Sequence, residues 1–217
     1  MTSCLLESWS HQATVGSKSI VLPDGCRDLI GRTNPRGATE WFVSDLDQVA
    51  RQVLIEPNQS YRGFRLRPGT QIDENRIRSL VSELTTGCRD LDVSEIQDRL
   101  ENACRLPGRV AEAMDALRES RTATAAASAC GVGSRHFQRS IKRWTGHSPM
   151  FWIRLARVRR SGVMIANSTC LSDAALSSGF ADQSHMTREF RRWFGVSPAR
   201  FARDQDRVAR VRDKGFD

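Results

Sequence analysis

Ser-Arg-His-Phe-Gln-Arg-Ser-Ile-Lys-Arg-Trp-Thr-Gly-His-Ser-Pro at residues 134–149 and Gln-Ser-His-Met-Thr-Arg-Glu-Phe-Arg-Arg-Trp-Phe-Gly-Val-Ser-Pro at residues 183–198 are two copies of one pattern. The copies lie forty-nine residues apart, and the residue types His, Arg, Arg, Trp, Gly, Ser and Pro recur at matching positions. A recurrence at fixed spacing indicates one structural unit that is used twice.

Each copy has the pattern of a helix with one apolar face and one polar, basic face. The apolar side chains follow the spacing i, i+4, i+7, which places them on one stripe of a helix, so we expect them to pack inward. They are Phe137, Ile141 and Trp144 in the first copy, and Met186, Phe190 and Trp193 in the second. The opposite faces are rich in Arg, Gln and Lys, the side chains that proteins use to contact DNA.

Both copies end with the same signals, and both follow a segment of small residues. Gly146 and Gly195 favour a left-handed helix end, after which a Ser can cap a new helix that starts with Pro149 or Pro198. The preceding segments, residues 125–131 and 174–179, are rich in Ala and Ser and end in Gly, which allows close helix crossing and a tight turn. These features predict two helix-turn-helix units.

The charge distribution divides the chain into two modules. Residues 1–105 contain 13 Lys and Arg against 15 Asp and Glu, whereas residues 106–217 contain 20 against 10, which gives this half a net charge of +10. Within residues 120–203 there are 14 basic residues and only three acidic ones, Asp173, Asp182 and Glu189. Such an excess predicts a surface that faces a polyanion such as DNA.

The stretch Ala-Ala-Leu-Ser-Ser-Gly-Phe-Ala-Asp-Gln-Ser-His-Met-Thr-Arg-Glu-Phe-Arg-Arg-Trp-Phe-Gly-Val-Ser-Pro at 174–198 closely resembles the signature of the AraC/XylS family of bacterial transcription regulators. The resemblance covers residues 106–203. It implies two helix-turn-helix units, joined by a long helix, that place two recognition helices in successive major grooves of double-stranded DNA. It also implies RNA polymerase as a partner. The first copy departs from the family pattern at Gly133, where a capping Ser is usual.

The resemblance assigns DNA-contacting positions to both copies. We expect base contacts from Arg135, Gln138, Arg139, Gln183, Ser184, Thr187 and Arg188, with Arg139, Gln183 and Arg188 favoured. Lys142 and Arg191 complete the polar faces. Arg143 and Arg192 are interpreted as phosphate contacts or as ion pairs with neighbouring helices, and half of the base-contact list is expected to touch the backbone only. The repeated His136 and His185 are interpreted as packing or capping residues.

The joining helix is expected to run from Pro149 to about Ile165, or roughly 25 Å. This length can hold two recognition helices on one face of DNA, about one helical turn apart. Its Arg154, Arg157, Arg159 and Arg160 are interpreted as phosphate contacts or as solvated surface residues.

The first half has the pattern of a small antiparallel β structure followed by helices. Short segments rich in β-branched and aromatic residues at 19–22, 40–43, 52–55 and 61–66 are separated by turn signals, which predicts strands. The pattern becomes helical over residues 73–104, where Ile77, Leu80, Val81 and Leu84 form one stripe and Asp92 to Glu95 match a capping box. The chain is therefore predicted to be α+β: a small antiparallel β N-terminal domain with helices, then an all-α DNA-binding domain.

Residues 10–105 also resemble, more weakly, an uncharacterised N-terminal domain that precedes AraC-type regions. We therefore divide the chain into a sensor or dimerisation domain at 1–105, an AraC-type DNA-binding domain at 106–203 and a charged tail at 204–217. A small-molecule effector and a homodimer are expected partners, and no ligand is identified. Arg65 and Arg67 share a strand face that suits either an anion or a polar outer surface. The Ile77 stripe suits either a dimer contact or a cover for the β structure. Trp41 and Phe42 are expected in the core.

Other functional classes receive less support from the residues. The six cysteines, Cys4, Cys26, Cys88, Cys104, Cys130 and Cys170, contain no Cys-x-x-Cys pair, so we expect no zinc site, disulfide framework or cofactor. No secretory or membrane-spanning segment is apparent, and a cytoplasmic location is expected. The alternatives are a protein-binding co-regulator, or an AraC-type domain coupled to a DNA-repair enzyme. The latter has no suitable cysteine cluster, and we expect no enzymatic activity.

Overall fold

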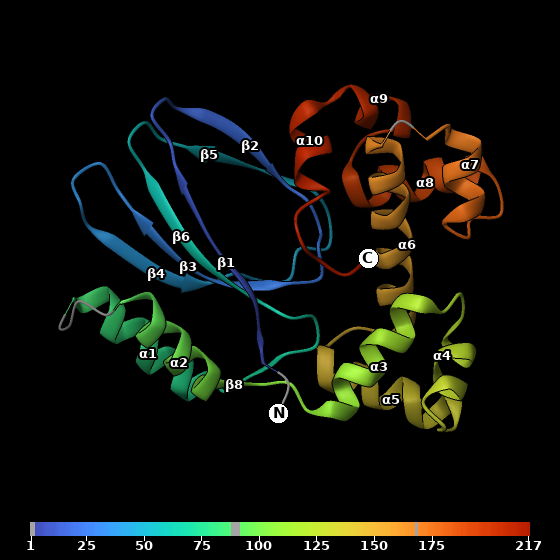
Figure 1. Cartoon of the computed structure of the whole chain (residues 1–217), viewed down its shortest axis with the longest axis horizontal. Helices are drawn as coiled ribbons and strands as arrows, with labels where there is room; N and C mark the ends of the chain where they lie inside the picture. The colour runs from blue at the N-terminus through green and yellow to red at the C-terminus, as the bar shows by residue number, and fades with distance from the viewer. Residues whose placement is uncertain (1–2, 88–91, 168) are drawn as a thin grey trace. The chain divides into compact units, whose positions relative to one another are not determined.

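The computed structural model describes residues 3–87, 92–167 and 169–217 (Figure 1). Its contacts form two compact units, and both are discontinuous in sequence. Unit 1 comprises Met1–Lys18, Cys26–Asp45 and Leu54–Ala111, and unit 2 comprises Ser19–Gly25, Leu46–Val53 and Glu112–Asp217. Two short segments of the first half of the chain therefore pack with the helices of the second half.

A four-stranded antiparallel sheet forms the centre of unit 1. Its order is β1 (Leu5–Gln12), β6 (Ser60–Leu66), β3 (Arg27–Thr33) and β4 (Thr39–Val43). Two further pairs complete the strands: β2 (Ser17–Val21) with β5 (Arg51–Ile55), and β7 (Gln71–Ile72) with β8 (Cys104–Arg105). All four predicted strand segments are confirmed, as β2, β4, β5 and β6. Sequence reasoning missed β1 and β3, whose charged, Ser and Gly residues have low strand propensity.

Two helices cover one face of this sheet. Helix α1 (Glu74–Thr86) starts at the cap Asp73, and α2 (Val93–Ala103) starts at the predicted capping box of Asp92 and Glu95. Leu80 of α1 and Ile96 of α2 are buried, and α1 contacts β4. The interpretation that the Ile77 stripe covers the β structure is therefore confirmed for Ile77 and Leu80, which are 5% and 4% exposed and so lack the exposure that a dimer contact needs.

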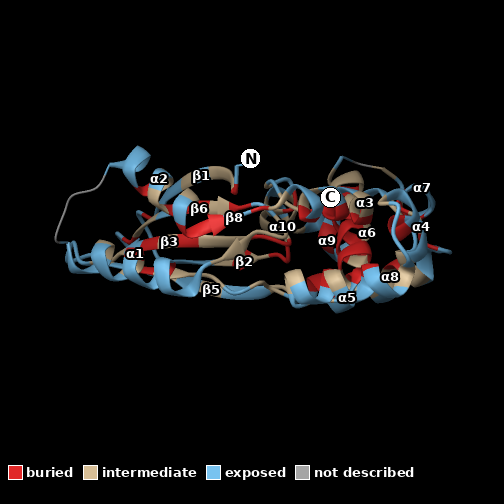
Figure 2. Ribbon diagram, turned by 90° about the horizontal axis from the view of Figure 1, so that it is seen from below, coloured by how far each residue is buried: buried red, intermediate tan, exposed pale blue. Residues whose placement is uncertain are grey.

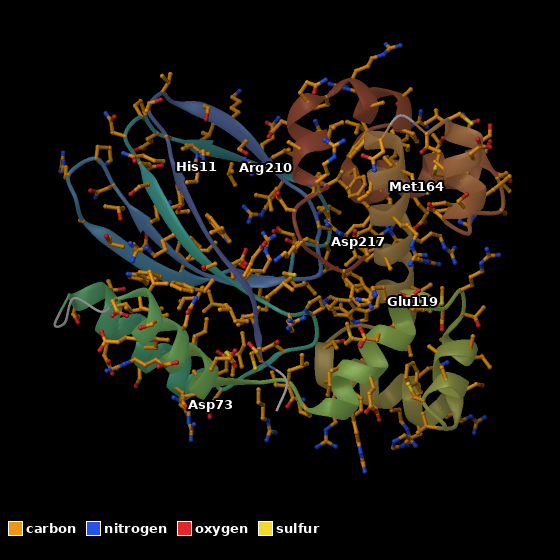
Figure 3. All side chains as sticks on the ribbon, viewed as in Figure 1. His11, Asp73, Glu119, Met164, Arg210 and Asp217 are labelled. Atoms are coloured by element: carbon orange, nitrogen blue, oxygen red, sulfur yellow. The ribbon has the colours of Figure 1, made fainter. Side chains whose placement is uncertain are left out.

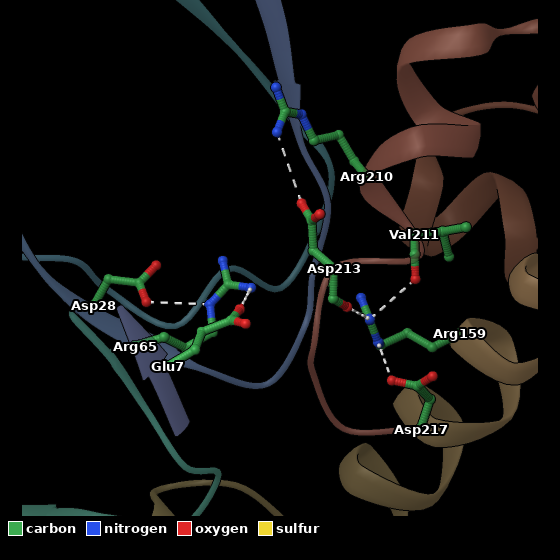
Figure 4. A network of polar contacts seen from close by, with 8 residues as sticks. All are labelled: Glu7, Asp28, Arg65, Arg159, Arg210, Val211, Asp213 and Asp217. Atoms are coloured by element: carbon green, nitrogen blue, oxygen red, sulfur yellow. Dashed lines mark hydrogen bonds and ion pairs between the residues drawn. The ribbon is translucent and has the colours of Figure 1, made fainter. Parts of the chain in front are cut away.

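The other face of the sheet carries paired charges. Arg65 donates hydrogen bonds to Asp28 at 3.2 Å and to Glu7 at 3.3 Å (Figure 4). The hypothesis that Arg65 and Arg67 form an anion site is therefore wrong for Arg65, because its guanidinium is neutralised by two carboxylates. Burial raises the pKa of Asp28, and the neighbouring Arg65 opposes that rise. Trp41 lies in the core as expected, while Phe42 is half-buried.

Unit 2 consists mainly of helices, and the predicted α+β fold class is confirmed. The helices of the second half are α3 (Gly108–Glu119), α4 (Ala123–Ala129), α5 (Ser134–Thr145), α6 (Pro149–Ala166), α7 (Leu171–Ser177), α8 (Gln183–Phe194), α9 (Pro198–Arg203) and α10 (Gln205–Arg210). Helix α6 is the predicted joining helix and contacts elements of both helix-turn-helix units. Most of its residues are buried, which makes it the core of unit 2 (Figure 2).

One of the four arginines of α6, Arg159, is neither solvated nor free for phosphate. Arg159 is 0% exposed and donates hydrogen bonds to Asp217 and to the carbonyl oxygens of Val211 and Asp213 (Figure 4). It also donates to the carbonyl oxygen of Pro23. The predicted surface role of this residue is wrong, because its charge is satisfied inside the protein by the chain's last turn.

The two segments from the first half are held in unit 2 by specific hydrogen bonds. The backbone N–H of Ile20 donates to a carboxylate oxygen of Asp206 at 3.0 Å. The N–H of Ala50 donates to the Trp193 carbonyl at 2.8 Å. These bonds reach α10 and α8, so residues 19–25 and 46–53 help to define unit 2.

Candidate nucleic-acid interface

The two helix-turn-helix units are α4 with α5, and α7 with α8. Helices α5 and α8 end at Gly146 and Gly195, which adopt the left-handed conformation with φ of 75° and 72°. Ser148 and Ser197 then cap α6 and α9, whose first residues are prolines. These predicted signals are all confirmed. They set the direction that the chain takes after α5 and after α8.

The starts of the two recognition helices differ, as the sequence predicted. Gly133 is the cap of α5 and offers no side-chain hydrogen bond. Asp182 caps α8 and accepts a hydrogen bond from the backbone N–H of His185 at 2.6 Å. A side chain accepts a hydrogen bond from a free backbone N–H of the first turn in α8 but not in α5. The first turn of α8 therefore has the stronger cap.

Helix α5 buries one stripe and exposes the other. Phe137 and Ile141 are 2% and 0% exposed. Trp144 was predicted to pack inward with them, but it is only half-buried. The predicted DNA-contacting residues of this helix are all exposed: Arg135, Gln138, Arg139, Lys142 and Arg143.

Helix α8 repeats this arrangement with a larger core. Met186, Phe190 and Trp193 are all buried, and the indole N–H of Trp193 donates to Glu189 at 3.1 Å. Thr187 is half-buried. The other predicted contact residues of α8 are exposed: Gln183, Ser184, Arg188, Arg191 and Arg192.

The exposed arginines and lysine of these helices have no neutralising partner within the described parts of the chain. Neither hydrogen bonds nor ion pairs are formed by the side chains of the eleven predicted contact residues in residues 3–87, 92–167 and 169–217. The ion-pair alternative for Arg143 and Arg192 therefore has no partner in these ranges. A cluster of unpaired cations on two matching helix faces is suited to bind a polyanion.

The histidines that recur in the motif occupy different environments. His185 packs edge-on against Phe180, with ring centroids 5.3 Å apart, which fits the predicted packing role. His136 is exposed and its ring nitrogen lies 3.4 Å from the hydroxyl of Ser140. Among the described residues, no group of three or more His, Cys, Asp or Glu is arranged to hold a metal ion.

Sequence reasoning interpreted Arg157 and Arg160 as phosphate contacts or solvated residues and missed the contacts that they make within unit 2. Arg157 donates to the carbonyl of Arg121 at 3.3 Å, and its guanidinium lies 5.5 Å from the ring centroid of Phe180. Arg160 donates to the carbonyl of Arg118 at 2.9 Å. Arg157 thus connects the region before α4 with the turn before α8. The available signal was the presence of four arginines on a helix without acidic residues.

The geometry defines a double helix-turn-helix unit, and the comparisons agree. Residues 126–204 match the family model described as a helix-turn-helix domain. The predicted AraC/XylS resemblance is confirmed, and this region is a helix-turn-helix domain.

Two curated transcriptional regulators are similar to this region. ExsA of Pseudomonas aeruginosa is 32% identical over 77 residues, which cover 35% of this chain and 28% of that protein. RipA of Corynebacterium glutamicum is 36% identical over 75 residues, or 35% of this chain and 23% of that protein. The match therefore spans less than a third of either relative.

Solved structures also resemble the chain. The DNA-binding domain of AdpA, in complex with a target DNA, has 27% identity and a TM-score of 0.40 over 48% of this chain and 94% of that chain. ToxT of Vibrio cholerae has 10% identity and a TM-score of 0.46 over 90% of this chain and 96% of that chain. Across the residues that the structure describes, none of the helices has the length and apolar character required to cross a bilayer.

Proposed function

We propose that the chain is a sequence-specific DNA-binding transcription regulator that uses α5 and α8 as recognition helices. The observation that carries this proposal is the pair of matching, solvent-exposed faces whose cations have no partner among the described residues. Each face lies opposite a buried apolar stripe, so the polar side chains are held outward on rigid helices. Both helices lie along the same side of unit 2 in Figure 2, which supports their contact with one DNA duplex.

The proposed contacts fall into two groups by side-chain chemistry and position. Arg139, Gln183 and Arg188 lie on exposed faces, and Arg and Gln form bidentate contacts with guanine and adenine. Arg143 and Arg192 lie in the last turns of their helices, next to the tryptophans, and are assigned to phosphates. The joining helix, whose 18 residues correspond to about 27 Å, supports the proposed insertion into successive major grooves.

The remaining assignments also stay proposals. Residues 106–203 are the proposed DNA-binding domain and residues 1–105 a proposed sensor or dimerisation domain. Residues 204–217, predicted as a charged tail, instead form α10 and bury Val211 and Phe216 in unit 2. RNA polymerase, a small-molecule effector and a second copy of the chain are proposed partners. A non-enzymatic role in the cytoplasm is the corresponding proposal. The alternative of a protein-binding co-regulator predicts no binding to naked DNA.

Selection of bound duplexes from a random pool by the full chain tests this function. We expect an enriched motif with two half-sites, and binding that weakens steeply with salt because phosphate contacts release counterions. Fluorescence anisotropy of the enriched duplex against a scrambled duplex measures the specificity. Equal affinity for both duplexes, or no binding at low salt, would contradict the proposal and favour the co-regulator.

A further inference from the structure

One end of the four-stranded sheet of unit 1 is polar. A cavity lies there, between the sheet and helices α1 and α2. The register aligns Ser10, Arg62, Gly31 and Trp41 in one cross-strand row on a single face of the sheet. The next row outward on that face is Gln12, Ser60, Thr33 and Thr39. On the inner side of these rows, Leu29 and Phe64 pair across β3 and β6 and are both 0% exposed. One face thus changes from apolar core to polar surface within a few residues.

This polar end forms the floor of a cavity of about 640 Å³. Leu84 and Thr85 of α1 and Ile96 of α2 contribute its apolar wall and one further hydroxyl. His11 at the end of β1, which Figure 3 labels, is one of the residues that line the cavity. The volume lies within the range of about 300–1,000 Å³ that is typical of small-molecule sites.

Arg62 gives the cavity its charge. Its side chain is exposed, and within residues 3–87, 92–167 and 169–217 it has no hydrogen bond or ion pair. None of the described residues that line the cavity is acidic. Arg65, by contrast, lies on the opposite face of β6 and is paired with Asp28 and Glu7. An unpaired guanidinium in a concave site whose described lining has no acidic residue is suited to a carboxylate or phosphate, which it binds through two parallel hydrogen bonds.

Trp41 gives the cavity a planar apolar surface. A Cβ atom at Gly31 would lie 2.7 Å from the indole ring, so only glycine lets the ring pack flat against β3. The ring also stacks on Phe64, with centroids 6.3 Å apart. Beside it, the hydroxyls of Thr33 and Thr39 lie 2.8 Å apart and share one hydrogen bond. The wall therefore combines a fixed aromatic surface with hydroxyl groups that can each accept or donate further hydrogen bonds.

We propose that this cavity binds a small organic anion that has a planar or ring-shaped body with hydroxyl groups. Arg62 binds the anionic head, Trp41 contacts the planar body, and the side chains of Thr33, Thr39 and Ser60 bind its hydroxyls. The site lies wholly within unit 1. It therefore does not depend on the proposed DNA binding, and either proposal can fail alone.

Calorimetric titration of the full chain with 4-hydroxybenzoate, and with its neutral analogue 4-hydroxybenzamide, tests the site. We expect saturable binding of the anion with one site per chain, and binding of the amide that is at least about tenfold weaker because it lacks the charge-assisted pair. Phenyl phosphate identifies the head group: tighter binding than 4-hydroxybenzoate assigns a phosphate monoester, and weaker binding assigns a carboxylate. Absence of binding by all the anionic probes would overturn the proposal.

Two matched variants locate the bound anion. R62A is expected to weaken binding of 4-hydroxybenzoate at least about tenfold. R32A removes the same charge from the opposite face of the sheet, where Arg32 pairs with Glu40 at 2.5 Å, and is expected to leave binding unchanged. Circular dichroism confirms that both variants fold. G31A provides a second test, because its methyl group displaces the indole ring. Equal binding by R62A and the unchanged chain would overturn the proposal.

Discussion

The Nε of Arg159 donates a hydrogen bond to Oδ1 of Asp217 at 3.1 Å, across 58 positions of the sequence. Arg159 is wholly buried in the joining helix α6, whereas the Asp217 side chain is 29% exposed. The other hydrogen bonds of the Arg159 guanidinium go to backbone carbonyl oxygens, including that of Asp213 at 2.8 Å. A buried guanidinium must have its donors satisfied, so the last residues of the chain are part of the support for α6.

Removal of the Asp217 carboxylate should destabilise unit 2. D217A leaves the buried charge of Arg159 without its only anionic hydrogen-bond acceptor among the described residues, and we expect a loss of about 1–3 kcal/mol in the free energy of unfolding. D213A is the matched control, because the Asp213 carbonyl remains and, among the described residues, its side chain forms only an exposed pair with Arg210, which is worth about 0–1 kcal/mol. Urea unfolding followed by circular dichroism measures both. Equal losses would contradict the assigned role of Asp217.

Base and phosphate contacts should separate by mutation. R188A is expected to cost about 1–3 kcal/mol on the preferred site and to relax the preference at one position, because a bidentate base contact is lost. R143A should weaken binding to all sequences nearly equally and reduce the salt dependence. Both side chains are exposed, so neither variant disturbs the core. Selection profiles decide between the roles, and an unchanged profile for R188A would refute its assignment to a base.

An isolated fragment of residues 106–217 is expected to bind duplex DNA but to be less stable than unit 2 in the full chain. It lacks the segments that contribute the bond from Ala50 to Trp193, at 2.8 Å, and the Pro23 acceptor of Arg159. Lost hydrogen bonds of this kind cost about 0.5–1.5 kcal/mol each. Anisotropy measures the binding, and urea unfolding measures the stability. A fragment as stable as the full chain would show that these segments contribute nothing to unit 2.

The recognition helices were predictable because their signals are local. The stripe of Phe137 and Ile141, the glycine ends and the serine caps each act within a few residues, so spacing alone identifies them. Arg159 was not predictable in this way. Its partners Pro23 and Asp217 lie 136 and 58 positions away, and its neighbours in the sequence match those of a solvated helix face.

The residues that line the cavity of unit 1 come together through the register of strand pairing, which could not be predicted from the sequence. Ser10, Arg62 and Gly31 form one row only because β1 and β3 both pair with β6, and neither β1 nor β3 was predicted. The same pairing separates Arg62 from Arg65 and places them on opposite faces. A single strand pattern could not decide which arginine is neutralised, because the carboxylates of Glu7 and Asp28 come from the two missing strands.

The cysteines should differ in reactivity according to burial. Burial raises the pKa of Cys4 to about 11 and that of Cys104 to about 12. Cys170 is exposed at the start of α7. Because the thiolate is the reactive form, N-ethylmaleimide at neutral pH should label Cys170 rapidly and the two buried thiols only after unfolding. Mass spectrometry of the peptides measures each rate, with the Cys88 peptide, which lies outside the described residues, scored separately. Equal rates for Cys4 and Cys170 would contradict this order.

The stability of unit 2 should decrease as the pH falls below the ordinary range of histidine. The ring of His147 stacks on Phe151, with centroids 4.1 Å apart, and burial lowers its pKa from the usual value of 6.5. The folded state therefore binds the proton less readily than the unfolded state. The contribution of the neutral His147 ring to the free energy of unfolding is fully present above pH 6.5. It is lost as the pH falls through the pKa of His147 in the folded state.

A phenylalanine in place of His147 isolates this contribution. H147F keeps an aromatic ring on Phe151 and removes the titrating group, so the difference in unfolding free energy between the unchanged chain and H147F should be constant above about pH 7.5 and shift in favour of H147F at lower pH. Urea unfolding at a series of pH values measures this difference, in which the other titrating groups cancel. A difference that stays constant down to pH 5 would mean that the His147 imidazolium is accommodated in the folded unit, contrary to the lowered pKa.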